Sequence, residues 1–242
     1  MSFRLPTTEE KADYVLNQFN RIARRYDLAN DTISLGMHRG WKKLAIEALA
    51  VKPDGQYLDV CCGTGDLTLR IAKRLAGTGH VTGLDFSTNM LEVAKLRLGQ
   101  NNALMSSVSF VEGDAEKLPF SDNQFDSAVI SFGLRNLTHL DKGLSEMTRV
   151  VKSGGKVLNL DLGHPNNRLF KPIYYFYFRH IVPIIGALLQ RDMKAYTYLP
   201  QSLDTYPAPE EIGKLFQAVG LTNVQYSPLA MGSVALHVGT KP

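Results

Sequence analysis

A glycine turn that directly follows an apolar run constrains the fold of this chain more than any other feature. The run 57–62 leads into Gly63 and Gly65, and a helical pattern follows at once. Twenty residues past Gly65, a second apolar run, 81–84, ends on Asp85. Glycine lets the backbone approach a ligand closely, and a carboxylate at a strand end accepts hydrogen bonds from ribose hydroxyls. The pattern is typical of a nucleoside-cofactor site.

The turn also indicates which kind of nucleoside. A dinucleotide fingerprint needs a third glycine, which would fall at position 68, where the chain has Thr68. The substitution argues against a pyrophosphate and for a single nucleoside, such as S-adenosylmethionine. A nicotinamide-dependent dehydrogenase, the alternative enzyme class, would need the missing glycine.

Charge and cysteine content exclude several other classes. Among 242 residues, 27 basic and 23 acidic side chains give a net charge of +4, too mild to indicate nucleic acid. The two cysteines, Cys61 and Cys62, are adjacent, so neither a disulfide framework nor a metal-ligand spacing exists. The stretch 1–6 has no apolar signal core, which favours the cytoplasm.

The order of elements predicts the fold class. Strands are expected at 56–62, 80–86, 107–112, 125–132, 156–162, 222–226 and 234–238, and helices at 66–75, 88–98, 141–151 and 209–218. This alternation predicts an α/β fold with a doubly wound, mostly parallel, seven-stranded sheet.

One domain, 1–242, is expected to carry two additions to this sheet. Thr7 and Glu10 have capping-box spacing before a helical period, and a second helix is expected over 40–49. The predicted division is a helical cover 1–52, a cofactor-binding core 53–163, an apolar insertion or lid 164–206, and a C-terminal helix with strands, 207–242.

Cofactor-binding candidates lie at the carboxyl ends of the expected strands, where open parallel sheets bind ligands. Asp85 suits the ribose hydroxyls, Asp114 suits an adenine amino group, and the Ala115 amide suits a ring nitrogen. Ser131 ends the fourth strand near the expected sulfonium. The first turn contributes Asp59, Gly63, Thr64 and Gly65. The alternative role of each aspartate is a helix cap or a turn former.

Several segments resemble known methyltransferases. The glycine turn with 84–87 and 113–120 is similar to class I S-adenosylmethionine-dependent methyltransferases, whose Rossmann-like sheet the resemblance implies. The segments 26–41, 131–138 and 232–241 resemble the ubiquinone/menaquinone biosynthesis C-methyltransferases, and 149–163 does so in part, because Asp161 and Gly163 replace the usual Glu and Ser.

The resemblance implies C-methylation of a prenylated hydroquinol ring. The turn is most similar to that of enzymes that convert demethylmenaquinol to menaquinol, with phylloquinol or ubiquinol precursors as the alternative acceptors. Two further functions stay open: a non-catalytic scaffold of a quinone pathway, and a methyltransferase for another small aromatic.

Four residues are catalytic candidates. The permanent charge of Arg135 would stabilise a phenolate, and Asn136 would orient that oxygen or a water. Tyr26 would hydrogen-bond the quinol, and His38 is the alternative base. Arg135 could instead form a surface salt bridge, and His38 could simply pack beside Trp41.

The apolar, aromatic segment 170–189 suits an acceptor with a long prenyl tail. Arg179 and Pro183 interrupt it, so it is too short to span a bilayer. We expect it to contact the prenyl tail or the inner face of the membrane, where basic residues would meet anionic headgroups. A buried lid, or a dimer helix in a homo-oligomer, is the alternative.

Overall fold

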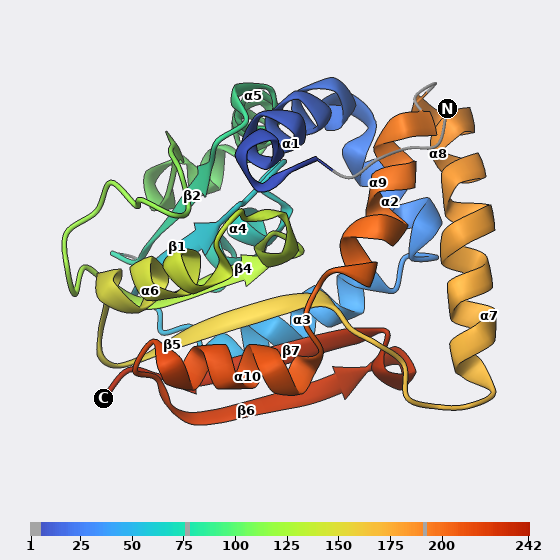
Figure 1. The fold of residues 1–242 in the computed structure, drawn as a ribbon. Helices are drawn as coiled ribbons and strands as arrows, with labels where there is room; N and C mark the ends of the chain where they lie inside the picture. The colour runs from blue at the N-terminus through green and yellow to red at the C-terminus, as the bar shows by residue number, and fades with distance from the viewer. Residues whose placement is uncertain (1–5, 76–77, 191–192) are drawn as a thin grey trace.

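The structure is a computed structural model that describes residues 6–75, 78–190 and 193–242. Residues 1–5, on which the expectation about a signal segment mostly rests, lie outside the described residues. A seven-stranded sheet has the order β3-β2-β1-β4-β5-β7-β6 (Figure 1). Its strands are β1 Gln56–Val60, β2 His80–Asp85, β3 Val108–Glu112, β4 Phe125–Ser131, β5 Val151–Leu162, β6 Thr222–Leu229 and β7 Val234–Thr240.

The pairing of the strands explains where a ligand can bind. β1 pairs in parallel with both β2 and β4, and β3 and β5 extend the parallel part on either side. β7 runs antiparallel to both β5 and β6. The chain order therefore reverses between β1 and β4, and the carboxyl ends at such a switch point form a crevice. The predicted mostly parallel, seven-stranded sheet is confirmed.

Helices cover both faces of the sheet. They are α3 His38–Leu49, α4 Asp66–Ala72, α5 Thr88–Gly99, α6 Leu140–Val150 and α10 Pro209–Ala218. One core buries Leu144 of α6 and Phe216 of α10, and these helices lie in front of the sheet in Figure 1. A second core buries Ile46 of α3 and Ile71 of α4. Each face is thus sealed by apolar helix stripes, which leaves the strand ends for binding.

The N-terminal cover crosses the carboxyl ends of the strands. It consists of α1 Thr8–Ile22, a 3-10 turn Ala23–Arg25, and α2 Tyr26–Ile33. The Glu10 carboxylate accepts the Thr7 N–H at 3.0 Å, as the capping-box spacing predicted. The sequence did not predict α2, which begins inside the segment that carried the family resemblance.

The segment after β5 is helical, although its pattern predicted only an apolar insertion. It forms α7 Phe170–Phe176, a π-helical turn Tyr177–Ile181, α8 Val182–Gln190 and α9 Met193–Asp204. A third core joins this segment to the cover through Ala29, Tyr174, Phe178 and Val182. These helices stand beyond the strand ends in Figure 1. In the described part of the chain, no helix is long and apolar enough to span a membrane.

Two elements begin at least two residues away from their predicted starts. β5 begins at Val151 rather than at 156, because its pairing with β4 shifts register between Phe125 and Ser127 and Gly154 takes a φ of 79°. The pair Gly154 and Gly155 therefore forms an irregularity inside the strand. α3 begins two residues earlier than expected, at His38.

Candidate active site

The residues that directly follow two neighbouring strands have strained backbone conformations. Cys61 after β1 and Phe132 after β4 have φ values of 55° and 58°. Each such conformation costs a non-glycine residue about 1 to 3 kcal/mol, and it persists only where the surroundings enforce it. The two exits touch, because a Cβ on Gly133 would lie 2.6 Å from the Cys61 Cβ. Strain of this kind is concentrated at functional sites.

A first cavity of about 480 Å³ opens at these strand ends beneath α1. It has the size of a small-molecule site. Seven residues that the sequence singled out line it together: Tyr26, Gly63, Asp85, Asp114, Ala115, Ser131 and Asn136. Helix α1 supplies further walls that sequence reasoning missed, including Val15, Leu16 and Phe19.

Asp85 lies buried at the end of β2 with both oxygens directed by backbone donors. It accepts the Gly63 N–H at 2.8 Å and the Ser87 N–H at 2.9 Å. Burial raises the pKa of Asp85 to about 6, although these backbone hydrogen bonds lower it. Each carboxylate oxygen has two acceptor sites, so both retain capacity for a ligand hydroxyl.

Other groups of the first cavity also suit a polar nucleoside. A Cβ on Gly63 would meet only the Tyr26 ring, at 3.9 Å, so the glycine leaves open space for a ligand. Ser131 Oγ and Asn136 Oδ1 are buried without a hydrogen-bond partner in the described part of the chain. Unsatisfied buried polar atoms that line a cavity indicate a ligand that would pair with them. The residues fit the methyl donor that the sequence predicted.

Asp114 has the turn-forming role and also lines the first cavity. Its carboxylate accepts the Glu116 N–H at 2.8 Å, which is the turn-forming role. Asp114 and the buried Ala115 also line the first cavity. The turn therefore fixes the position of the segment that would face an adenine ring.

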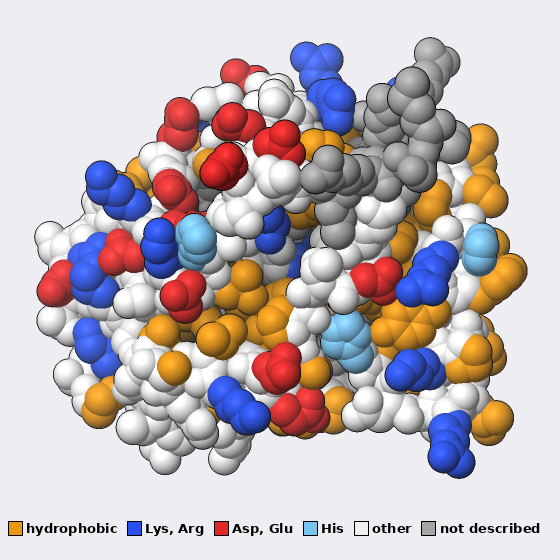
Figure 2. Space-filling view, viewed as in Figure 1, with side chains coloured by type: hydrophobic (Ala, Val, Ile, Leu, Met, Phe, Trp, Pro, Cys, Tyr) orange, Lys and Arg blue, Asp and Glu red, His pale blue; other side chains and the backbone are white. Residues whose placement is uncertain are grey.

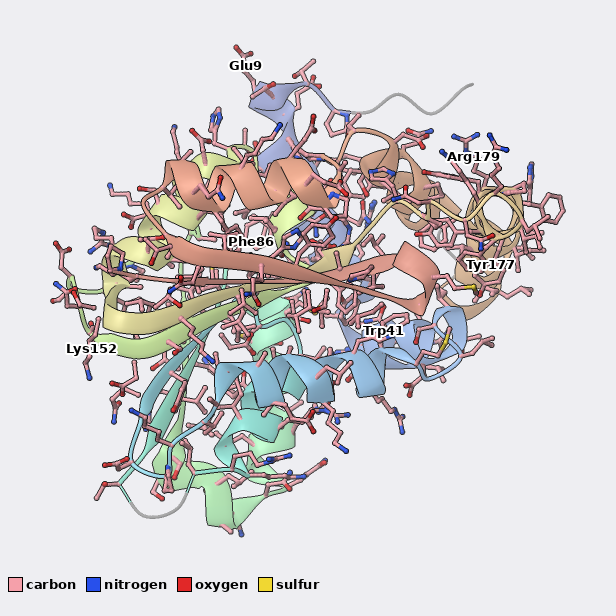
Figure 3. All side chains as sticks on the ribbon, turned by 90° about the horizontal axis from the view of Figure 1, so that it is seen from below. Glu9, Trp41, Phe86, Lys152, Tyr177 and Arg179 are labelled. Atoms are coloured by element: carbon pink, nitrogen blue, oxygen red, sulfur yellow. The ribbon has the colours of Figure 1, made fainter. Side chains whose placement is uncertain are left out.

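A second cavity of about 440 Å³ lies on the other side of the strand exits. Apolar and aromatic side chains from α2, α3, α7 and the π-helical turn line most of it, among them Ile33, Trp41, Ile173, Tyr174, Tyr177 and Phe178. Figure 3 shows Trp41 and Tyr177 at the same end of the molecule, opposite Lys152. Five residues line both cavities: Tyr26, Cys61, Gly63, Ser131 and Phe132.

Arg135 lines the second cavity in a buried ion pair that the sequence did not predict. Its Nη1 lies 2.5 Å from Asp161 Oδ1, and the two side chains are 7% and 1% exposed. Burial alone would lower the pKa of Arg135, but Asp161, Tyr26 and Tyr198 together raise it, and the net shift of the pKa is upward. The Nε of Arg135 is buried without a partner in the described residues. The sequence left a surface salt bridge open as the alternative role of Arg135. Arg135 does form a salt bridge, but the pair is buried and not at the surface.

Three cofactor-binding candidates lie away from the first cavity. Asp59 and Thr64 line the second cavity instead, and Gly65 lines neither. Asp59 accepts the Thr68 hydroxyl at 2.6 Å, and burial raises the pKa of Asp59 to about 7. Gly65 has a φ of 74°, and a Cβ there would lie 2.9 Å from the Phe110 Cζ. Its role is close packing of the turn against β3.

The glycine turn is tied to the N-terminal cover through Asp27. Its carboxylate accepts the Thr64 hydroxyl at 2.7 Å and an Arg97 N–H at 2.7 Å. Sequence reasoning missed this role, although Asp27 follows Tyr26 in the segment that resembled the family. Lys11 ties the cover to the segment after β4, because its ammonium donates to the carbonyl groups of Arg135 and Leu137.

A family comparison assigns the chain. The model of the ubiE/COQ5 methyltransferase family matches residues 7–241. The chain belongs to this family. The expectation of a methyltransferase that uses S-adenosylmethionine is thereby confirmed.

Sequence relatives of this methyltransferase span nearly its whole length. It is 43% identical to the demethylmenaquinone methyltransferase of Desulfitobacterium hafniense, over 97% of this chain and 92% of the relative. It is 39% identical to the demethylmenaquinone methyltransferase of Halalkalibacterium halodurans, over 97% of this chain and 95% of the relative.

Solved structures share the fold of this methyltransferase at lower identity. A Thermotoga maritima SAM-dependent methyltransferase gives a TM-score of 0.63 at 18% identity, covering 93% of this chain and 99% of that chain. A Haemonchus contortus phosphoethanolamine N-methyltransferase, solved with S-adenosyl-L-methionine, gives 0.57 at 18% identity, covering 81% and 52%. Both support the Rossmann-like fold.

The buried pair predicts a large stability effect for Asp161→Asn. This variant leaves the Arg135 guanidinium buried without its counter-charge, and removal of one partner of a buried pair costs about 3 to 5 kcal/mol. The matched control is Asp204→Asn, whose pair with Arg179 is exposed on both sides. That change should cost at most about 1 kcal/mol. Urea denaturation of both variants measures the difference, and equal losses would contradict the assignment.

Proposed function

We propose that this chain transfers the methyl group of S-adenosylmethionine to a ring carbon of reduced demethylmenaquinone. One observation carries the proposal: the cavity that Asp85 and Asp114 line and the cavity that the aromatic side chains of α7 line share a wall of five residues at the strand exits. A methyl donor on one side and a ring on the other would meet at that wall. The relatives that match over the whole chain are named for this acceptor.

The first cavity holds the methyl donor in this proposal. Asp85 accepts the ribose hydroxyls, and Asp114 with Ala115 binds the adenine. Ser131 and Tyr26, which line both cavities, stand where the reacting groups meet. When bound, the donor supplies an electrophilic methyl group on a sulfonium. Residues 53–163 thus supply the polar contacts of the donor and α1 of the cover closes over it, while α2, α3 and α7 line the acceptor cavity.

The acceptor must be the hydroquinol, because attack by an aromatic carbon requires an electron-rich ring. Ionisation of a ring hydroxyl raises the electron density at the adjacent carbon. Arg135 stabilises that oxygen anion with its permanent charge, and its unpartnered Nε is a donor available for it. Tyr26, which lines both cavities, hydrogen-bonds the quinol. Asn136 lines only the first cavity, so it would pair with the donor rather than orient the acceptor oxygen as the sequence predicted. Burial strengthens each of these interactions, since water competes less.

The direct test is a methyl-transfer assay with deuterated S-adenosylmethionine. Reduced demethylmenaquinone should gain one labelled methyl group, detected by mass spectrometry, while the oxidised quinone should gain none. A demethylated benzoquinol analogue forms the second arm, because the sequence left a ubiquinol precursor open as the acceptor. Turnover of the benzoquinol alone would assign that acceptor instead, and turnover of neither would overturn the proposal.

Loss of the Asp85 carboxylate should weaken donor binding. A buried hydrogen bond to a charged group is worth about 1.5 to 3 kcal/mol, so Asp85→Ala should lower the affinity for S-adenosylmethionine by that amount. Calorimetric titration gives the dissociation constant. The control is Asp141→Ala on the exposed first turn of α6, which should bind as the wild type does. An unchanged constant in Asp85→Ala would refute the ribose contact.

The mouth of the second cavity supports a membrane-facing site in the same proposal. Leu35, Met37, Ile173 and Met231 line this cavity and are 78%, 49%, 63% and 62% exposed. They come from three segments: the α2–α3 connection, α7 and the 3-10 turn Ala230–Gly232. Exposed apolar side chains that surround a cavity are typical of an interaction site.

Leu35 is unfavourable in water for two reasons, its backbone conformation and its exposed apolar side chain, and a lipid contact would offset this cost. It has a φ of 50°, in the left-handed region, and its side chain is largely exposed although it is apolar. A solvent-facing turn at this φ would favour glycine or asparagine. Insertion of the leucine into the acyl boundary of a bilayer would stabilise it.

The rest of this surface continues along α7 and α8. Leu169, Phe176, Ile184 and Leu188 are exposed there, and Figure 2 shows apolar side chains along that edge of the molecule. Lys171 and Arg179 are exposed beside them and would meet anionic headgroups. The protein would act from the cytoplasm and take its acceptor from the adjoining leaflet.

Vesicle sedimentation tests the membrane contact. The double variant Leu35→Ser and Ile173→Ser should bind vesicles of phosphatidylcholine and phosphatidylglycerol at least about tenfold more weakly, since burial of one such side chain is worth about 1.5 to 3 kcal/mol. Leu96→Ser on α5 is the control, because Leu96 is 70% exposed and lines neither cavity. Equal binding of all three proteins would exclude this surface as the contact.

A further inference from the structure

His38 lines the second cavity, and only one of its two ring nitrogens has a polar partner in the described residues. Its Nε2 lies 3.1 Å from Asp31 Oδ1. Its Nδ1 is buried and has no hydrogen-bond partner in the described part of the chain. The residue is 8% exposed, so bulk water does not satisfy this nitrogen. A buried ring nitrogen without a partner at a ligand cavity indicates a bond that a ligand would complete.

Asp31 is itself held in place. The Arg39 guanidinium donates through Nε to Asp31 Oδ1 at 2.9 Å and through Nη2 to Asp31 Oδ2 at 2.6 Å. This two-bond fork fixes the orientation of the carboxylate. A carboxylate near one imidazole nitrogen favours the proton on that nitrogen. The neutral ring of His38 therefore carries its proton on Nε2 and its lone pair on Nδ1.

The other titratable groups of the second cavity are less suited to accept a proton. Asp59 is engaged by the Thr68 hydroxyl, and Asp66 is paired with both Lys42 and Arg70. Burial raises the pKa of both cysteine thiols, which remain protonated. Burial likewise raises the pKa of Tyr174, so its hydroxyl also stays protonated.

We propose that His38 Nδ1 takes the hydroxyl proton of the acceptor bound in the second cavity and that Asp31 is the positioning residue that fixes the required tautomer. This inference rests on the proposed function and names the base for the same site. Arg135, which lines the same cavity, would then stabilise the oxygen anion that the proton leaves behind.

The step balances in atoms and charge. The O–H bond of the hydroquinol breaks, the proton binds Nδ1, and the electron pair stays on the oxygen. The adjacent ring carbon forms its bond to the methyl group as the methyl–sulfur bond breaks with its electron pair on sulfur. The same ring carbon then loses its hydrogen as a proton, and the oxygen regains one. One proton is released overall, which balances the positive charge lost from the sulfonium.

The charges around His38 leave it neutral near pH 7. Burial lowers the pKa of His38, and so do the neighbouring Lys42 and Arg39, whereas Asp31 and Asp66 raise it. The net shift is downward from the ordinary value of 6.5. His38 is thus deprotonated, and able to accept a proton, at neutral pH and above, and it loses this ability as the pH falls through its lowered pKa.

His38→Gln tests the base. A positioned general base contributes about 10²- to 10⁴-fold, so kcat should fall at least about 100-fold. The dissociation constant of S-adenosylmethionine should stay unchanged, because His38 does not line the first cavity. His80→Gln, at the opposite end of β2 from the site, should retain wild-type kcat. Added imidazole should restore part of the rate of His38→Ala. Wild-type kcat in His38→Gln would overturn the inference.

Asp31→Asn separates positioning from a structural role through the pH profile. Loss of the Asp31 charge removes a contribution that raises the pKa of His38, so the acid limb of kcat/KM should move to lower pH. We also expect kcat to fall about tenfold. An acid limb at the wild-type pH would overturn the role of Asp31. A wild-type enzyme that methylates no hydroquinol would instead refute the proposed function, which the methyl-transfer assay reads separately.

Discussion

The parallel pairing of β1 with β4 is the constraint on which the site depends. The register sets Val60 beside Ile130, so both strands leave the sheet at one level. Cys61, directly after β1, and Phe132, directly after β4, then turn through left-handed conformations next to each other. Because these two turns form most of the common wall, they divide the crevice into the first and the second cavity. A shift of this register by one residue would exchange the faces of every side chain on one strand and remove the wall.

The buried pair of Arg135 and Asp161 joins the geometry of the site to its electrostatics. Asp161 lies on β5 and Arg135 follows β4, so the pair links two neighbouring strands where they end. An unpaired guanidinium would be costly at this depth, and the carboxylate makes its burial tolerable. The charge is thereby kept inside an apolar cavity, where it acts on a developing anion with little screening by water.

Local patterns predicted the strands of the sheet and seven of the residues that line the first cavity. Each strand except β5 matched its expected start within about one residue, since apolar runs bounded by turn residues are local signals. The helices of the cover and the insertion were less predictable. α2 begins at Tyr26 and α7 at Phe170, and both obtain their stability from a core that they build together. Such long-range packing leaves no simple periodicity in either segment.

The sequence by itself determined that Asp85 and Asp114 lie at the strand ends, because each follows a strand whose end is set by its own residues. Tertiary structure alone decided the partners of the second cavity. Asp161 was visible only as a departure from a family pattern, and its pairing with Arg135 joins positions 26 residues apart. The assignment of Asp59 to the second cavity and the charges around His38 arose in the same way. Two side chains from separate segments form a pair only where the fold brings those segments together. The residue pattern of one segment does not show which other segment will lie beside it.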